Sequence, residues 1–252
     1  MEVSIVVPTY NERENVPRLI ELIDEKLRGL FSYEVVVVDD NSPDGTAEVA
    51  EKLSEKYPVR VLKRPGKLGV TSAIYDGMRA SHGRIIVVMD ADLQHPPEVI
   101  PRLIERSRTC DIVVASRYCP GGGVENWSTM RKLVSSGAVL LARILVPNCL
   151  RVKDPVSGFF ALRREVAEAW KPIEPRGFKA LVEILGTHRN ARVCEEPYLF
   201  RGRARGSSKL SGNVMLSYVK LLVKLGWRRI ALIFAVLALT VLITVLARIL
   251  ST

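Results

Sequence analysis

Short runs of β-branched residues alternate with helical patterns, and this rhythm constrains the fold of the chain more than any other feature. The apolar runs are Val3–Val7, Val35–Val38, Val59–Leu62, Ile85–Met89 and Ile112–Ala115, with helical patterns near 14–27, 46–56, 70–80 and 98–106. Strands that are apolar throughout are typical of sheets buried on both faces, and their alternation with helices indicates βαβ units. The sequence therefore predicts an α/β domain with a Rossmann-like, mostly parallel sheet.

Polar residues follow three of these strands, at the end where α/β sheets bind ligands. They are Asn11-Glu12 after the first strand, Asp39-Asp40 after the second and Asp90-Ala91-Asp92 after the fourth. Asp44, a little further on, is explained as the cap of the helix expected from Thr46. Asp90 and Asp92 fit that explanation poorly, because two carboxylates this close repel each other unless a cation lies between them. Hard divalent cations prefer oxygen ligands, so the pair predicts a metal site.

Basic residues occupy the later segments. Arg117 follows the fifth strand, and Arg131 and Ser135 lie one turn apart on a helix expected to run to about Val146, so they share a face. Residues 201–209 form a glycine-rich basic loop, which is either a solvated linker or a clamp that closes on phosphates. Together with the acidic site, these groups suit transfer from a diphosphate donor.

The positive charge of the chain is concentrated at its C-terminal end. The net charge is +10, and residues 201–252 hold nine Lys and Arg but no Asp or Glu. Within this segment, residues 230–247 form an uncharged run of 18, close to the length that one membrane-spanning helix needs. Arg228 and Arg229 precede the run, so the positive-inside rule predicts a cytoplasmic catalytic domain. A buried or oligomerising helix is the alternative.

Just before that run, residues 213–227 have the pattern of an amphipathic helix. Lys220 and Lys224 lie on one face, and Leu221, Leu222 and Leu225 lie largely opposite. A basic helix of this kind beside an apolar run is typical of the membrane interface, although a surface helix packed on the domain has the same pattern. The predicted organisation is a catalytic domain at 1–209, an interface helix at 210–228 and a single transmembrane helix at 229–250.

The four cysteines, Cys110, Cys119, Cys149 and Cys194, form no CxxC pair and have no histidine at metal-ligand spacing. We expect reduced structural thiols in a cytosolic domain. The first ten residues lack a basic segment followed by an apolar one, so no signal peptide is expected.

Several strings in the sequence resemble the family-2 glycosyltransferases of the GT-A fold, and among them the branch that mannosylates dolichyl phosphate. These strings are VPTYNERENV, VVDDNSPDGT, MDADLQHPPE, ASRY, GGGVENW, DPVSGFFALRREV and RGRARGSSKL. The resemblance covers nearly all of residues 1–228. It implies transfer of mannose from GDP-mannose to a dolichyl or similar polyprenyl phosphate, with help from Mg²⁺ or Mn²⁺.

The resemblance also assigns roles to residues. It places Pro8, Tyr10, Glu12, Val37 and Asp39 at the nucleoside, and Asp90, Asp92 and Gln94 at the metal and donor phosphates, backed by Ala91. Lys179, Arg203 and Lys209 are expected to contact the donor, and Arg117, Arg131 and Ser135 the acceptor phosphate. Asp92, Arg117 and Arg131 are the residues on which catalysis is expected to depend most. No oligomeric state is predicted.

Other functions remain as alternatives. The same chemistry with UDP-glucose or another UDP-sugar as donor would change only the nucleoside pocket. A membrane-anchored, non-catalytic nucleotide-binding module would not need the carboxylates and the basic groups together. A nucleic-acid partner is not expected, because residues 201–213 contain no aromatic side chain for base stacking.

Overall fold

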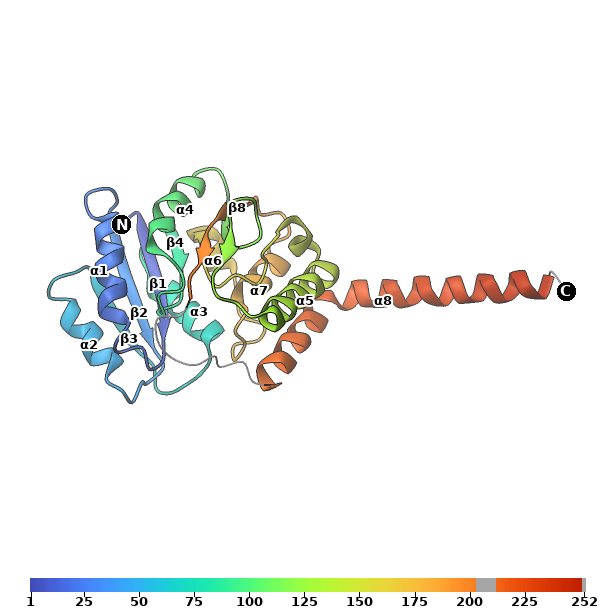
Figure 1. Ribbon diagram of the computed structural model, residues 1–252, viewed down its shortest axis with the longest axis horizontal. Coiled ribbons are helices and arrows are strands. Elements are labelled where there is room, and N and C mark those ends of the chain that lie inside the picture. The colour runs from blue at the N-terminus through green and yellow to red at the C-terminus, as the bar shows by residue number, and fades with distance from the viewer. Residues whose placement is uncertain (203–211, 251–252) are drawn as a thin grey trace.

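A seven-stranded mixed sheet forms the centre of the molecule, with helices on both faces (Figure 1). The computed structural model describes residues 1–202 and 212–250; within the last helix it describes side chains at 215–237, 240, 243 and 244. The strands are β1 (Val3–Thr9), β2 (Tyr33–Asp39), β3 (Val59–Lys63), β4 (Ile85–Val88), β5 (Ile112–Ser116), β6 (Gly123–Val124), β7 (Phe160–Arg163), β8 (Val193–Pro197) and β9 (Leu199–Phe200). The helices are α1 (Val16–Leu27), α2 (Thr46–Leu53), α3 (Val70–Ala80), α4 (Ile100–Arg106), α5 (Thr129–Leu145), α6 (Arg164–Ala169), α7 (Ala180–Thr187) and α8 (Gly212–Leu250), with short 3-10 turns η1 (Pro97–Val99) and η2 (Pro147–Arg151).

The strand order of this sheet is β3-β2-β1-β4-β7-β5-β8. Every neighbouring pair is parallel except that β7 runs antiparallel between β4 and β5. The predicted α/β class and mostly parallel sheet are therefore confirmed. The five predicted strands are present with ends shifted by up to two residues, whereas the sequence reading missed β7 and β8.

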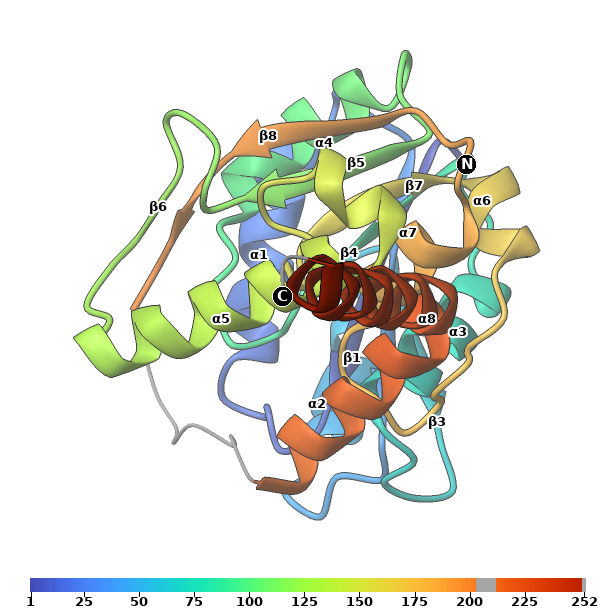
Figure 2. The same ribbon diagram turned by 90° about the vertical axis from the view of Figure 1, so that its right-hand side faces the viewer.

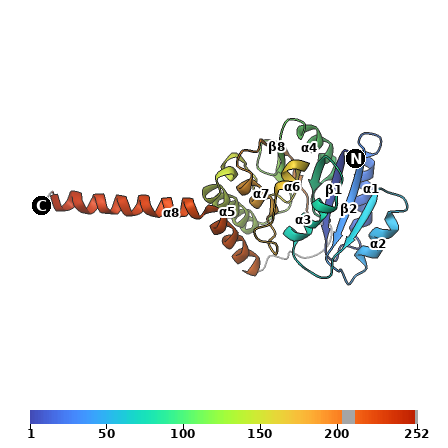
Figure 3. The same cartoon turned by 180° about the vertical axis from the view of Figure 1, so that it is seen from behind.

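Two hydrophobic clusters cover the two faces of the sheet, because alternate residues of each strand point to opposite sides. Val6, Val36 and Val38 pack toward α3 and the C-terminal helices, whereas Val35 and Val37 pack toward α1 and α4. Figure 3 shows α1 and α2 beside the β3 edge and α7 with α5 at the other end. The polar residues at the strand ends are thereby held at one edge by a buried framework.

The C-terminal helix α8 packs its first half on the domain, beside α5 (Figure 2). Leu221 and Leu222 are buried, and the Tyr218 hydroxyl donates to the Ala138 carbonyl at 2.7 Å. At Gly226 the helices cross so closely that a Cβ would lie 2.6 Å from the Leu145 carbonyl oxygen. The Leu221 face of this helix thus packs on the domain, as the alternative of a helix packed on the domain predicts, and it completes the protein core.

A different face of α8 is apolar and exposed. Leu216, Val219, Val223 and Trp227 lie near one another on the side away from the buried residues, and they are 54%, 43%, 48% and 59% exposed. Beyond them the helix leaves the domain as a long rod (Figure 1). Among the described residues, no helix combines the length and apolarity needed to cross a membrane, so the helix expected to do so at 229–250 is not found there.

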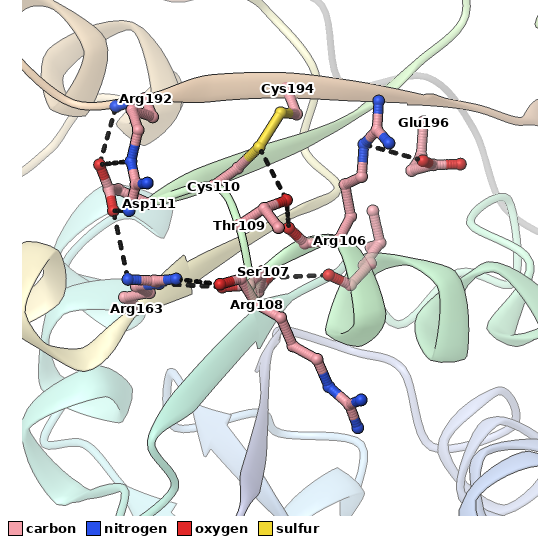
Figure 4. The surroundings of a disulfide bond; sticks show 11 residues. Arg106, Ser107, Arg108, Thr109, Cys110, Asp111, Arg163, Arg192, Cys194 and Glu196 are labelled. Atoms are coloured by element: carbon pink, nitrogen blue, oxygen red, sulfur yellow. Dashed lines mark hydrogen bonds and ion pairs between the residues drawn. A yellow bond between two sulfur atoms is a disulfide. The ribbon is translucent and has the colours of Figure 1, made fainter.

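The cysteines differ from their prediction. Cys110 and Cys194 form a disulfide, which joins the turn before β5 to β8, and only Cys119 and Cys149 are free thiols (Figure 4). The two cysteines are 84 residues apart in sequence and become neighbours because β8 pairs with β5. The expectation of four reduced thiols is therefore wrong, since linear spacing carries no information about this long-range strand pairing.

Candidate functional site

The predicted metal motif lies directly after β4, at the carboxyl edge of the sheet. The Asp90 side chain is 49% exposed, whereas Asp92 is 7% exposed. Asp92 Oδ1 accepts a hydrogen bond from the Gln94 backbone amide at 3.2 Å. Leu93 between them has φ 62°, a strained value for a bulky residue, and such strain is typical of functional loops. The loop therefore holds one carboxylate at the surface and a second one just beneath it.

A buried histidine fixes the position of Asp90. The Asp90 amide donates to Nδ1 of His95 at 3.0 Å, and the His95 ring stacks on Phe159 with 5.2 Å between centroids. Burial lowers the pKa of His95, so the ring stays neutral and Nδ1 can accept this hydrogen bond. Gly158 makes room, because a Cβ there would lie 3.2 Å from both Asp90 Oδ2 and His95 Cε1. His95 thus supports the metal motif from below, a role that the sequence reading did not assign.

These residues fit a hard divalent cation that is completed by its substrate. Among residues 1–202 and the described part of α8, no three His, Cys, Asp or Glu side chains gather as a full protein cage. Mg²⁺ is commonly held by one or two carboxylates together with substrate phosphates, and the exposed Asp90 beside Asp92 offers such an oxygen set. The donor set therefore agrees with a cation that binds together with a diphosphate.

Gln94, the third predicted ligand, fastens the metal motif to the chain that follows β9. Its Nε2 donates to the Arg201 carbonyl at 3.0 Å, and the Arg201 amide donates to the Gln94 carbonyl at 3.1 Å. Arg201 is also paired with Glu98 at 2.9 Å. The side-chain amide nitrogen of Gln94 is thus occupied, and the structure ties the start of the basic segment to the acidic motif. Arg203 and Lys209, the donor contacts expected in that segment, lie outside the described residues.

The expected nucleoside residues gather at the ends of β1 and β2. Asp39 is buried, and its carboxylate accepts hydrogen bonds from Thr9 Oγ1 at 3.0 Å and from the Ser42 amide at 2.8 Å. Lys67 lies 4.0 Å from the centre of the Tyr10 ring. Asn11 and Asn41, which follow these strands, both adopt left-handed backbone angles, so both loops turn sharply at the edge.

Four further residues expected near the donor have clear places. The Glu12 carboxylate accepts a hydrogen bond from Asn15 Nδ2 at 2.7 Å. Pro8 lies near the end of β1 and is partly exposed. Val37 and Ala91 are 1% and 3% exposed and belong to the hydrophobic cluster under α1 and α4. Alternation along β2 directs the Val37 side chain into the core, so any contact of Val37 with the nucleoside would come from its backbone.

Arg117 forms a buried ion pair instead of standing alone as a phosphate receptor. Its Nε and Nη2 donate to the two carboxylate oxygens of Asp154, both at 2.7 Å, and its backbone amide donates to the same carboxylate at 3.0 Å. Arg117 is 8% exposed and Asp154 is fully buried. Burial alone would lower the pKa of Arg117, but the Asp154 carboxylate raises it above its ordinary value, so the guanidinium stays charged. If Arg117 contacts the acceptor phosphate as expected, it does so while it remains paired with the Asp154 carboxylate.

Two arginines share one aromatic wall. The guanidinium carbon of Arg131 lies 4.3 Å from the Trp127 ring centre, and that of Arg117 lies 5.4 Å from the same ring. Both also lie within 6 Å of the Phe200 ring. On the same helix as Arg131, Ser135 accepts a hydrogen bond from the Tyr118 hydroxyl at 2.8 Å. The structure thus brings Arg117, Arg131 and Ser135 together as expected and adds Trp127 and Phe200, which the sequence reading did not single out.

Lys179 joins this region from the turn before α7. Its ammonium donates to the Val156 carbonyl at 2.8 Å. The residue as a whole keeps some solvent exposure, but protein atoms surround the ammonium, and this burial together with the charge of Arg117 lowers its pKa to about 8. A lysine with this pKa changes its charge near neutral pH.

The geometry can be compared with known proteins at this point. A model of the family described as "Glycosyl transferase family 2" matches residues 4–170. A dolichol-phosphate mannosyltransferase of Pyrococcus furiosus is 52% identical over 221 residues, which are 87% of this chain and 62% of that protein. The chain thus spans less than two thirds of the length of that relative. A protein of the same name from Saccharomyces cerevisiae is 36% identical over 89% of this chain and 87% of its own length.

Solved structures agree on the fold. Glucosyl-3-phosphoglycerate synthase from Mycobacterium tuberculosis, in complex with Mg²⁺ and uridine diphosphate, superposes with a TM-score of 0.69 at 23% identity, covering 89% of this chain and 79% of that one. The same enzyme with Mn²⁺, uridine diphosphate and its product gives 0.68. The fold thus defines an α/β protein of the GT-A type. The chain belongs to glycosyl transferase family 2, the family that its sequence strings indicated.

Proposed function

We propose that the chain is a metal-dependent, inverting glycosyltransferase that moves mannose from GDP-mannose to dolichyl or a similar polyprenyl phosphate. The observation that carries the proposal is the meeting of two sites of opposite charge at one edge of the sheet. Asp90 and Asp92 offer a cation and diphosphate site, and Arg117 and Arg131 on the Trp127 wall offer an anion site. The names of the relatives at 52% and 36% identity support the same donor and acceptor classes.

The acceptor would react as a nucleophile without a general base. A phosphate monoester has a second pKa of about 6, so it is largely a dianion near neutral pH. The protein's task is to hold this anion beside the negatively charged donor. Arg131 and Arg117 supply charge and N–H donors for that purpose, and both guanidinium groups lie close to the Trp127 ring. A cation held by Asp90 and Asp92 supplies neutralisation of the departing diphosphate.

A single displacement at the anomeric carbon inverts its configuration. An α-linked donor would therefore give a β-linked mannosyl phosphate. In this scheme the acidic and basic sites serve different partners: Asp90 and Asp92 would hold a cation that neutralises the leaving group, and the arginines act on the attacking group.

We propose, further, that the chain works at a membrane, with its catalytic domain on the cytoplasmic face. The outer side of α5 supports this, because Met130, Leu133, Leu140, Leu141 and Ile144 are exposed at helical spacing. Arg131 and Ser135 lie on another side of the same helix, toward the site. An apolar helix face beside an anion site suits an acceptor whose phosphate lies at the membrane surface while its lipid chain lies in the bilayer. Helix α8, which packs on α5, carries the exposed stripe of Leu216, Val219, Val223 and Trp227, and Arg228 and Arg229 follow.

The experiment that tests the reaction is transfer of radiolabelled sugar to dolichyl phosphate in the presence and absence of Mn²⁺. GDP-mannose, UDP-glucose and UDP-N-acetylglucosamine are offered separately. We expect metal-dependent labelling from GDP-mannose alone. Labelling from a UDP-sugar would replace the donor, and no labelling from any donor would contradict the proposed transfer and favour a nucleotide-binding module. A vesicle flotation assay with and without anionic lipid tests the membrane proposal separately.

A further inference from the structure

The acceptor side of the site contains a carboxylate, Asp154, in a place where a phosphate-binding site would be expected to hold only positive charge. Asp154 is fully buried, and its carboxylate accepts hydrogen bonds from the Nε–H and from one Nη2–H of Arg117. A guanidinium has five N–H groups in a fixed plane, so three of them remain for another ligand. Because two parallel hydrogen bonds fix the plane of Arg117, they also fix the direction in which the remaining N–H groups point.

Asp154 is itself held from the neighbouring strand. The backbone amides of Lys153 and Asp154 donate to the carboxylate of Glu195 on β8, at 3.0 and 3.2 Å. The Ser157 amide donates to the Asp154 carbonyl at 3.2 Å. The carboxylate that orients Arg117 thus belongs to a turn that is tied to β8 and closed by its own backbone hydrogen bond.

The pair also settles the charge balance beside the Trp127 wall. Arg117 and Arg131 approach the same ring, and like charges this close repel each other. Asp154 neutralises Arg117, so Arg117 contributes directed N–H donors with little net charge.

We propose that Asp154 is a positioning residue for the acceptor phosphate, acting through Arg117. This inference rests on the proposed function, since it names how the acceptor site of that reaction is built. It assigns no proton transfer to Asp154, because both carboxylate oxygens are occupied by the guanidinium.

The first test is the acceptor kinetics of Asp154→Asn, which keeps the shape of the side chain but removes its charge and one acceptor oxygen. We expect kcat/KM for polyprenyl phosphate to fall at least tenfold, while the donor KM changes less than twofold. Asp154→Glu should recover part of the loss. Asp111→Asn is the matched control, because Asp111 pairs with Arg192 at 3.1 Å at the opposite end of β5. Equal acceptor kinetics in Asp154→Asn and the wild type would overturn the proposal.

A double variant separates positioning from any direct chemical role. If Asp154 acts only through Arg117, adding Asp154→Asn to Arg117→Ala should cause no further loss of acceptor kcat/KM. It should also raise the thermal midpoint above that of Arg117→Ala alone, because the single variant leaves a buried carboxylate unpaired. A further loss of tenfold in the double variant would show that Asp154 touches the reaction directly and would overturn the positioning role.

Binding of a short-chain polyprenyl monophosphate, measured by calorimetry without donor, distinguishes this inference from the proposed function. Binding that weakens tenfold in Asp154→Asn but not in Asp111→Asn supports the inference even if the wild type transfers no sugar. Transfer by the wild type with unaltered binding by Asp154→Asn overturns the inference and leaves the proposed function standing. Absence of both binding and transfer in the wild type overturns both.

Discussion

The two edges of the sheet carry similar charged residues in different surroundings. At the amino edge, Glu34 accepts hydrogen bonds from Ser4 Oγ at 2.7 Å and from the His82 amide at 2.6 Å, and Asp111 pairs with Arg192. These networks tie strands and turns to one another. At the carboxyl edge, Asp90 is half exposed beside a strained Leu93, and Arg117 keeps N–H groups beyond those that Asp154 takes. A charged side chain is therefore available to a ligand where the fold holds it without using all of its hydrogen-bonding groups.

The amino edge also holds the disulfide between Cys110 and Cys194, close to Asp111, Arg163 and Arg192 (Figure 4). Along β5, only a few residues separate this covalent link from Arg117. If the contrast between the edges is correct, changes at the carboxyl edge should alter turnover more than stability, and changes at the amino edge should do the opposite.

The largest effect on turnover is expected from Asp92→Ala. Loss of this carboxylate should lower kcat by about 10³-fold, because a catalytic metal ion supplies several kcal/mol of charge stabilisation. Initial rates at saturating metal and donor measure the loss. Asp24→Asn is the control, since Asp24 accepts from the Tyr33 hydroxyl at 2.5 Å at the amino edge. Near-normal turnover by a correctly folded Asp92→Ala variant would contradict the assignment of a metal site to the carboxyl edge.

The position of this acidic pair could be predicted from the sequence, because it depends only on which residues directly follow a strand. Polar residues after an apolar strand must lie at a sheet edge, and in parallel strands that edge is shared. The five strands that were predicted all have runs of four or five residues that are mostly β-branched or otherwise apolar. β8 was missed because its sequence, VCEEP, includes two glutamates and its residues are only partly buried, so it lacks the pattern of a central strand.

The partners of those residues could not be predicted in the same way. The pairing of Arg117 with Asp154 spans 37 positions, and the disulfide spans 84, so both depend on strand order. The antiparallel insertion of β7 between β4 and β5 brings the string DPVSGFF under Asp90 and Arg117. The string was recognised by resemblance, but the roles of Asp154 and Gly158 became visible only in three dimensions.

A smaller effect, of about ten- to a hundredfold, is expected from Arg131→Ala. A hydrogen bond to a charged group contributes about 1.5–3 kcal/mol, and the loss should fall on kcat/KM for the lipid phosphate. Steady-state kinetics with varied acceptor and fixed donor measure it. Lys132→Ala removes a neighbouring exposed charge and should have little effect. If both variants lost activity equally, general attraction to an anionic surface would explain the result and Arg131 would have no special position.

A several-fold effect that depends on pH is expected from Lys179. Its pKa is about 8, so the ammonium is charged below this pH and loses its charge as the pH rises through it. Donor use should therefore decline on the alkaline side near pH 8. Lys179→Arg should move this decline to higher pH, because the arginine side chain stays charged. Lys171→Arg, on the exposed segment nearby, should leave the profile in place. If the pH profile were the same in Lys179→Arg, Lys171→Arg and the wild type, Lys179 would have no role in donor binding.

The smallest effect on turnover is expected at the amino edge, from replacing Cys110 and Cys194 by serine. Closing a loop of this length stabilises a protein by roughly 4 kcal/mol in the chain-entropy model, so the thermal midpoint should fall. The kinetic constants should stay within twofold, because the backbone ladder between β5 and β8 still holds Glu195 beside the Asp154 turn. Reducing the wild type with dithiothreitol should reproduce the lower midpoint, and the serine variant should not respond. A large loss of acceptor use at constant temperature would show that the covalent link also sets the position of Arg117, and the division between a stabilising edge and a reactive edge would then no longer hold.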